Sequence, residues 1–217
     1  MNANPLPRRW SMLSLGFFRA SPHFPVSFNS LPAMITRIMV VTVALSALAC
    51  KPNSEDMYAA LPAVGAPVPA FRYATTDGAM LDPAALRGRP AVVALWASTC
   101  SASRLALESL GALHREYASR KAAVVILADD HERAAVDSLM AAVRATAPVA
   151  LAGETLMATF THDQSVLPWR KAFALPTFLV LDAEGRVVYR QIGVEQDATH
   201  RLARVRAVMD SLLTPRE

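Results

Sequence analysis

Apolar runs and amphipathic stretches alternate along the second half of the chain. Residues 91–96, AVVALW, form a continuous apolar run of strand length, which is typical of a strand buried on both faces. Residues 122–128, AAVVILA, show the same pattern. Because a helical pattern follows each run, the order predicts an α/β domain with parallel strands joined by right-handed crossovers.

Three segments carry apolar side chains at helical spacing, so we expect helices that lie on the sheet with these side chains inward. The first segment is residues 101–120, and the last is residues 198–213. In chain order, the inward positions are Leu107, Leu110, Leu113, His114 and Tyr117; Val136, Leu139, Met140 and Val143; and Leu202, Val205, Met209 and Leu212.

Turn residues predict two antiparallel hairpins. Asp77-Gly78 marks the first, which precedes a short helical turn in LDPAALRG. In residues 176–193, PTFLVLDAEGRVVYRQIG, two apolar runs flank the second turn. Between the hairpins, residues 151–173 give the weakest pattern and predict a short strand followed by helical pieces broken near Pro168.

The chain begins with a leader of secretory type. From Met34, a short segment with one Arg precedes an uncharged apolar run that is too short to span a bilayer as a mature helix. The end of this run, SALAC, resembles a bacterial lipobox in which Cys50 would be lipidated and become the new N-terminus. An ordinary signal cut near Ala49 and an uncleaved anchor are the alternatives. Residues 1–33 lie upstream of the better start at Met34 and show no clear period.

The leader also carries the chain's net charge. Four arginines and no acidic residue lie in residues 1–49, so the whole excess of +4 belongs to this segment. The rest of the chain is formally neutral and gives no sign of nucleic acid binding. The predicted organisation is therefore a leader of residues 1–49, a tether of residues 50–69 rich in Pro and Ala, and a folded domain of residues 70–217.

The two cysteines differ in their surroundings. If Cys50 carries lipid, Cys100 is the one free thiol in an oxidising compartment. Cys100 falls between a strand and a helix, where unpaired backbone N–H groups and the helix dipole favour an anion. Since thiolate is the reactive form of cysteine, this position predicts a nucleophile.

A second element of the site precedes the last hairpin, at Leu175-Pro176-Thr177. A proline that enters a strand cannot donate a hydrogen bond to the sheet. If the bond before Pro176 is cis, it presents the preceding backbone to whatever lies opposite.

Together these stretches resemble a known family. Residues 65–100, GAPVPAFRYATTDGAMLDPAALRGRPAVVALWASTC, and residues 174–189, ALPTFLVLDAEGRVVY, are similar to the thioredoxin-like domains of extracytoplasmic TlpA and ResA type thiol-disulfide oxidoreductases. The resemblance implies an α/β thioredoxin-like fold with a central mixed sheet flanked by helices and an N-terminal β-hairpin extension. It also implies a redox protein tethered to a membrane on the periplasmic side, without a cofactor.

The resemblance further assigns roles to individual residues. It puts Cys100 in the nucleophilic position and Pro176 in the family's cis-proline position. Trp96 would lie at the edge of the site, and the backbone of Leu175 would pair with an extended substrate segment. Thr99 and Thr177 are the neighbouring residues that we expect to contact the substrate.

The chain departs from the family where its second cysteine should be. The family motif Cys-x-x-Cys is here CSAS, which ends in Ser103. Ser103 is expected either to bond the Cys100 thiolate or to be an ordinary helix residue, and it cannot release a substrate as a second thiol would. Ala94 stands where many thioredoxins keep a buried acid, and Thr99 replaces a bulky residue.

These features leave three hypotheses. The first is disulfide exchange by Cys100 alone with protein or small-molecule thiols and disulfides, resolved by an external thiol. The second is a non-catalytic binding module that keeps the fold. The third is a one-cysteine peroxidase, although Ala97 occupies the place where such enzymes usually carry a Thr.

The remaining polar residues predict no metal site. His114 lies on the inward face of its helix and is expected to be a core histidine rather than a base. His131, His162 and His200 are scattered, with no Cys or His at ligand spacing. The pair Asp129-Asp130 is expected to form a solvated strand end and helix cap.

Overall fold

A mixed five-stranded sheet runs through the centre of the part of the chain that the structure describes. The structure is a computed structural model that describes residues 54–161 and 173–214. The strand order is β5-β4-β3-β6-β7; β3, β4 and β5 are parallel, and β6 and β7 each run antiparallel to the preceding neighbour. The strands are β3 (Ala91–Trp96), β4 (Ala123–Ala128), β5 (Val149–Leu151), β6 (Thr177–Leu181) and β7 (Val187–Ile192). The predicted parallel strands and the second hairpin are thus confirmed.

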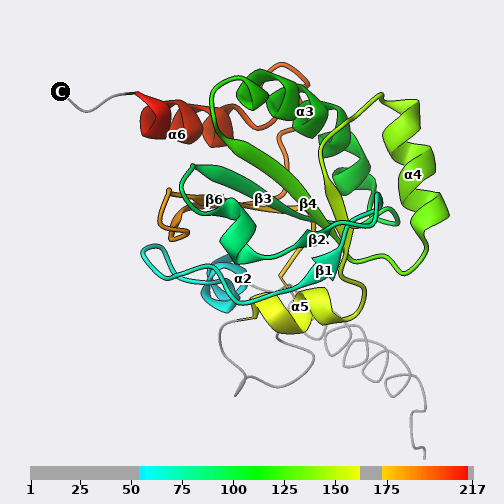
Figure 1. The fold of residues 1–217 in the computed structure, drawn as a ribbon, viewed down its shortest axis with the longest axis horizontal. Coiled ribbons are helices and arrows are strands. Elements are labelled where there is room, and N and C mark those ends of the chain that lie inside the picture. The colour runs from blue at the N-terminus through cyan, green and yellow to red at the C-terminus, as the bar shows by residue number, and fades with distance from the viewer. Residues whose placement is uncertain (1–53, 162–172, 215–217) are drawn as a thin grey trace, which may run out of the picture. The chain divides into compact units, whose positions relative to one another are not determined.

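Helices cover both faces of this sheet (Figure 1). One face carries α3 (Ser101–Ala118), α4 (Arg133–Ala142) and α6 (Ala203–Leu213); the other carries α5 (Thr155–Phe160) and the short 3-10 helix η1 (Pro83–Leu86). Side chains of β3 alternate between the two cores, with Trp96 facing α3 and Leu95 facing α5. The predicted α/β class, with a central mixed sheet flanked by helices, is confirmed.

The predicted N-terminal hairpin is also present. Strands β1 (Tyr73–Ala74) and β2 (Met80–Leu81) pair antiparallel. Gly78 adopts a φ of +92° in the connecting turn, a conformation that side chains disfavour. Leu81 is buried, so this hairpin is fixed to the domain by its apolar side.

Residues 54–69, which were predicted to be part of a tether, are instead packed against the domain. Helix α2 (Ser54–Ala60) begins in this segment, and Leu61 is only 1% exposed. The Arg190 guanidinium donates hydrogen bonds to the carbonyl oxygens of Tyr58, Leu61 and Pro62, at 2.7, 3.3 and 3.2 Å. Further along, the N–H of Gly65 donates to a carbonyl of β7 at 2.7 Å. The composition suggested a tether, but the few apolar side chains in the segment suffice to fix it to the domain.

The last helix begins later than predicted, and part of the weakly patterned region lies outside the described residues. The last helix begins at Ala203 rather than at residue 198, because Leu202 adopts a left-handed backbone with φ of 70°. The weakly patterned region contains β5 and α5 as expected, whereas the predicted break near Pro168 lies outside the described residues. The leader and Cys50 also lie outside them. Among the helices that the structure describes, none is long and apolar enough to cross a membrane.

Candidate functional site

Cys100 lies at the junction between β3 and α3, as the sequence predicted. It is the N-cap residue of α3, with an extended backbone (φ −87°, ψ 121°), and its side chain is half-buried. The Cys100 thiol donates a hydrogen bond to the carbonyl oxygen of Leu175 at 3.2 Å. The structure therefore brings together the two stretches that were predicted to form one site, although they are far apart in the chain.

The Leu175-Pro176 stretch forms the other side of the site. The peptide bond between these two residues is cis. Leu175 remains partly exposed, whereas Pro176 is buried and its carbonyl oxygen accepts a hydrogen bond from the N–H of Gly193 at 2.7 Å. Thr177 is fully buried, and its hydroxyl donates to the carbonyl of Ala174 at 2.6 Å. The expectation that Thr177 contacts the substrate is therefore wrong, because its side chain holds the turn before β6.

The surroundings of Cys100 favour its ionised form. Partial burial raises the pKa of the thiol, but this is outweighed by the backbone N–H and hydroxyl of Ser103, the N–H of Ala102 and the charge of Arg104. As a result the pKa of Cys100 lies below its ordinary value of 9.0. A thiol of this kind is more often present as the nucleophilic thiolate near neutral pH.

Ser103 lies one turn into α3 and is completely buried. Its hydroxyl oxygen accepts a hydrogen bond from the N–H of Ala97 at 3.3 Å, and the same hydroxyl contributes to the lowered pKa of Cys100. Of the two interpretations of this residue, the geometry supports a hydrogen-bond partner of the site. Ser103 links the connection before Cys100 to the first turn of the helix after it.

Trp96 does not lie at the edge of the site as the resemblance implied. Its side chain is fully buried, and the indole Nε1–H donates to the carbonyl of Ser103 at 2.7 Å. Trp96 therefore supports the first turn of α3 from inside the core. Thr99, by contrast, is exposed directly before Cys100, where a substrate can reach it.

Sequence reasoning missed the residues that hold Ser98, two positions before Cys100. The Ser98 N–H donates to one carboxylate oxygen of Asp130 at 2.9 Å, and the Ser98 hydroxyl donates to the other oxygen. The Arg104 guanidinium donates to the Ser98 carbonyl at 2.8 Å. Every polar group of Ser98 is thus bonded by a residue outside the connection between β3 and α3.

Asp130 corrects the expectation of a solvated helix cap. It is only 8% exposed, and the N-cap of α4 is Glu132. The neighbouring Asp129 is partly buried, which together with the charge of Asp130 raises the pKa of Asp129. The sequence did contain a signal for this contact, because two parallel strands side by side bring Asp130, just beyond β4, close to the residues just beyond β3.

The histidines that the structure describes make no hydrogen bond to Cys100, and His162 lies outside the described residues. His114 is partly buried on α3, about 20 Å farther along the helix at ~1.5 Å per residue, and burial lowers its pKa. His131 and His200 are exposed and pair with Glu154 and Asp197, at 3.7 and 2.9 Å. Within residues 54–161 and 173–214, no three metal-ligating side chains come together.

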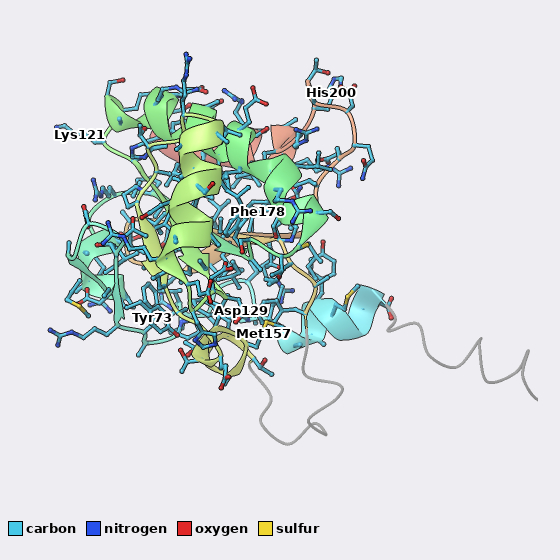
Figure 2. The ribbon with its side chains drawn as sticks, turned by 90° about the vertical axis from the view of Figure 1, so that its right-hand side faces the viewer. Tyr73, Lys121, Asp129, Met157, Phe178 and His200 are labelled. Carbon is cyan, nitrogen blue, oxygen red and sulfur yellow. The ribbon has the colours of Figure 1, made fainter. Side chains whose placement is uncertain are left out.

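A cavity of about 370 Å³ lies elsewhere, between α3 and the loop that leads to α6. Its lining residues are Glu108, Ser109, Ala112, Ala198, Thr199, Arg201, Ala203 and Arg206. Figure 2 shows His200, from the same loop, at the outer edge of the molecule, whereas Phe178 of β6 lies in its interior. Since Cys100 does not line this cavity, the reactive thiol and the concave surface are separate features.

Comparisons with known proteins agree with the observed architecture. Residues 63–208 match the Redoxin family. A thiol:disulfide interchange protein of the thioredoxin family from Chlorobium tepidum is 24% identical, with a TM-score of 0.56 over 70% of this chain and 99% of that one. A DsbF homologue from Corynebacterium diphtheriae is 21% identical, with a TM-score of 0.54 over 68% of this chain and 87% of that one.

A third structure is similar in the same way. The thioredoxin domain of a thiol-disulfide oxidoreductase from Bacteroides vulgatus is 15% identical, with a TM-score of 0.53 over 69% of this chain and 98% of that one. No curated protein matches the chain in sequence. The similarity to these structures shows that the fold is thioredoxin-like, as the resemblance implied.

Proposed function

The chain belongs to the Redoxin family, and on this premise we propose that Cys100 exchanges disulfides as a single thiol, with an external thiol completing the cycle. The observation that carries the proposal is the position of Cys100. It caps α3, has a lowered pKa, and lies 3.2 Å from the Leu175 carbonyl oxygen. These features give a nucleophile with a backbone acceptor beside it.

The first step of the proposed exchange is an attack on a substrate disulfide. The Cys100 thiolate forms a new bond to one sulfur while the old S–S bond breaks, and the departing thiolate takes up a proton. One substrate thiol is thereby released, and the other substrate sulfur stays linked to Cys100. The N–H groups at the start of α3 stabilise Cys100 as a thiolate both before the attack and when it later leaves.

The second step requires a thiol that the described residues do not provide. Ser103 occupies the position from which a second cysteine would attack, and a hydroxyl cannot replace a thiol in this reaction. An external thiolate therefore attacks the substrate sulfur of the linked species. Cys100 leaves as a thiolate, and the substrate sulfur ends in a disulfide with the external thiol.

The Leu175 backbone supports binding of an extended segment next to Cys100. In the free protein the Leu175 carbonyl accepts the Cys100 S–H. Once Cys100 is deprotonated or bound to substrate sulfur, that carbonyl is free to accept an N–H from the substrate backbone. Protein disulfides in extended segments are thus suitable substrates, with Thr99 exposed next to them.

We also propose that the protein acts outside the cytoplasm, as a membrane-anchored member of the TlpA and ResA type. The support lies in the signal-like leader, its SALAC ending at Cys50, and the presence of one further cysteine. Since α2 begins at Ser54, only a few residues would separate a lipid on Cys50 from the folded domain. Mass spectrometry of the protein extracted from membranes tests this anchor directly, and an unmodified Cys50 in the mature chain would contradict it.

Formation of the linked species tests the proposed exchange. The reduced protein is incubated with glutathione disulfide or with a disulfide-containing protein, and the products are identified by intact mass and peptide mapping. We expect an adduct on the peptide that contains residue 100, and none on that peptide in Cys100→Ala. If a folded wild-type protein forms no adduct with either substrate, the binding-module hypothesis replaces the proposal. If the protein consumes peroxide through Cys100 but forms no disulfide adduct, the peroxidase hypothesis replaces it.

A further inference from the structure

The connection between β3 and α3 is held by a buried carboxylate that the proposed exchange does not use. Asp130 lies just beyond β4, on the strand that pairs in parallel with β3, and Trp96 is in register with Ala128. Its two oxygens accept the N–H and the hydroxyl of Ser98. Both Asp130 and Ser98 are 8% exposed, so these bonds are shielded from water.

Burying a carboxylate in this position destabilises the fold unless its oxygens accept hydrogen bonds. Removing a charged group from water costs several kcal/mol, which charge-assisted hydrogen bonds must offset. Asp130 has no ion pair among the bonds that the structure gives it, and both bonds go to the same residue. Ser98 is therefore fixed in position and orientation by a single side chain from the neighbouring strand.

The position of Ser98 determines the position of Cys100. The Cys100 N–H donates to the carbonyl of Ala97 at 3.2 Å, and the carbonyl of Cys100 accepts the N–H of Arg104 at 3.0 Å. The Arg104 side chain returns to the Ser98 carbonyl at 2.8 Å. Arg104 thus links Ser98 to Cys100, and the bond between Cys100 and Ala97 closes the turn that contains Ser98, so a shift of Ser98 would move the thiol relative to the first turn of α3.

We propose that Asp130 is a positioning residue for Cys100. By holding Ser98 at two atoms, Asp130 keeps the Cys100 sulfur where the N–H groups of Ala102 and Ser103 stabilise the thiolate. The inference rests on the proposed function, in which Cys100 is the exchanging thiol, and adds a residue that acts on it without contacting the substrate.

The direction of the effect separates positioning from simple electrostatics. A nearby carboxylate disfavours a thiolate, so removing its charge alone would lower the pKa of Cys100. Losing the correct position of the sulfur would weaken the electrostatic stabilisation of the thiolate by the N–H groups of Ala102 and Ser103 and raise that pKa. The two mechanisms therefore predict shifts of opposite sign in the same variant.

Other charged groups lie close to Ser98 and Asp130. Arg104 approaches from α3, and Asp129 is next to Asp130 in the chain. His131 and Glu154 act electrostatically on Asp129. Because Asp129 makes no hydrogen bond to Ser98, Asp129→Asn is a matched control that changes local charge but leaves the Ser98 contacts intact.

The test is the pH dependence of Cys100 alkylation by iodoacetamide in the purified full chain. In Asp130→Ala, both oxygens that accept the N–H and the hydroxyl of Ser98 are removed, so both Ser98 contacts are lost. We expect the pKa from this profile to rise by about one unit, which slows alkylation about tenfold at pH values below the pKa. Ser98→Ala keeps the N–H contact and should shift the pKa in the same direction by less. Asp129→Asn should not raise it.

Two outcomes would overturn the inference. One is an unchanged or lowered Cys100 pKa in folded Asp130→Ala. If that variant does not fold, the same result in Ser98→Ala decides the matter. Alkylation needs no disulfide substrate, so the outcome is independent of the proposed exchange. If the variants show the expected pKa shifts but the wild-type protein forms no adduct with glutathione disulfide, the exchange is contradicted. The positioning role of Asp130 then still stands.

Discussion

Two connections lead from the central sheet to helices on the same face, and they differ in almost every other respect. The first joins β3 to α3 and contains Ala97 and Ser98, whose polar groups are bonded to α3 and to Asp130. The second joins β7 to α6 and carries Asp197, Thr199 and His200 on its exposed surface, bonded mainly to one another. The second borders the cavity of about 370 Å³, whereas the first carries the thiol.

The difference shows what makes a site reactive in this fold. The second connection offers concave space and charge but no cysteine. The first offers a cysteine at a helix N-terminus, where backbone N–H groups are free to stabilise an anion. In the proposed function, reactivity therefore depends on a fixed backbone around one sulfur atom rather than on the size of a cavity.

The largest expected effect comes from restoring a second thiol in the first connection. In Ser103→Cys, the introduced thiol can attack the linked species from within the chain. We expect the adduct with glutathione to disappear without added thiol, at least about tenfold faster than in the wild type. Intact mass spectrometry over time after removal of excess glutathione disulfide measures this.

The matched control for this variant is Ser109→Cys, on the same helix but at the cavity. A thiol there lies farther along α3 from Cys100, so the adduct should persist as it does in the wild type. Equal persistence of the adduct in Ser103→Cys and Ser109→Cys would mean that residue 103 is not placed to resolve it.

The next largest effect is the pH dependence of the wild-type thiol. Because the surroundings of Cys100 lower its pKa, alkylation should reach half its maximal rate at a lower pH in the folded protein than for the same cysteine in the urea-unfolded chain. It should fall about tenfold for each pH unit below that midpoint, since only the thiolate reacts. A midpoint in the folded protein equal to or above that of the unfolded chain, measured with iodoacetamide, would contradict the stabilisation of the thiolate by α3.

A moderate effect is expected from the indole that supports the first turn of α3. Trp96→Phe removes the hydrogen bond to Ser103 and leaves unfilled volume in the core. We expect a loss of about 1–3 kcal/mol in the free energy of unfolding and slower alkylation of Cys100. Urea denaturation and alkylation kinetics measure the two consequences.

Tyr117→Phe provides the control for Trp96→Phe. Tyr117 is also fully buried, but its hydroxyl donates to the carbonyl of Arg206 and to Asp210, at 3.2 and 3.1 Å, near the other end of α3. Its removal should cost about 1 kcal/mol of stability and leave Cys100 unchanged. If both variants slow alkylation equally, the effect reflects general loss of stability rather than the contact with Ser103.

The smallest effect is expected in the second connection. Hydrogen bonds from His200 and Thr199 lower the pKa of Asp197 to about 2, so it is charged throughout the range in which Cys100 titrates. Asp197→Asn should rearrange this exposed turn without changing Cys100 alkylation. A change beyond about twofold in that rate would show that the two connections are coupled, because exposed substitutions normally have small effects.

The sequence predicted the frame of the fold because its strands are nearly uninterrupted apolar runs. It also placed Cys100 opposite the segment Leu175-Pro176-Thr177, since the family resemblance covers both stretches. It failed at residues 54–69, where Pro and Ala suggested a tether but Leu61 is buried. Composition describes the average of a segment, whereas burial depends on one or two side chains that reach the core.

Within the site, the sequence could not predict which polar residues are buried. Asp130 was interpreted as a solvated cap because a carboxylate after a strand usually faces water. Its contact with Ser98 spans more than thirty residues of sequence and depends on the register of β3 and β4. The resemblance assigned Thr177 and Trp96 to the substrate site, but both side chains are fully buried in the domain.

The fate of the wild-type adduct on Cys100 is the most direct test of exchange by a single thiol. The protein is reacted with glutathione disulfide, separated from excess reagent, and followed by intact mass before and after addition of a thiol. We expect the adduct to form on Cys100, to persist while no thiol is present, and to be released when thiol is added. Absence of the adduct, or its release without any added thiol, would contradict exchange by a single thiol that cannot resolve itself.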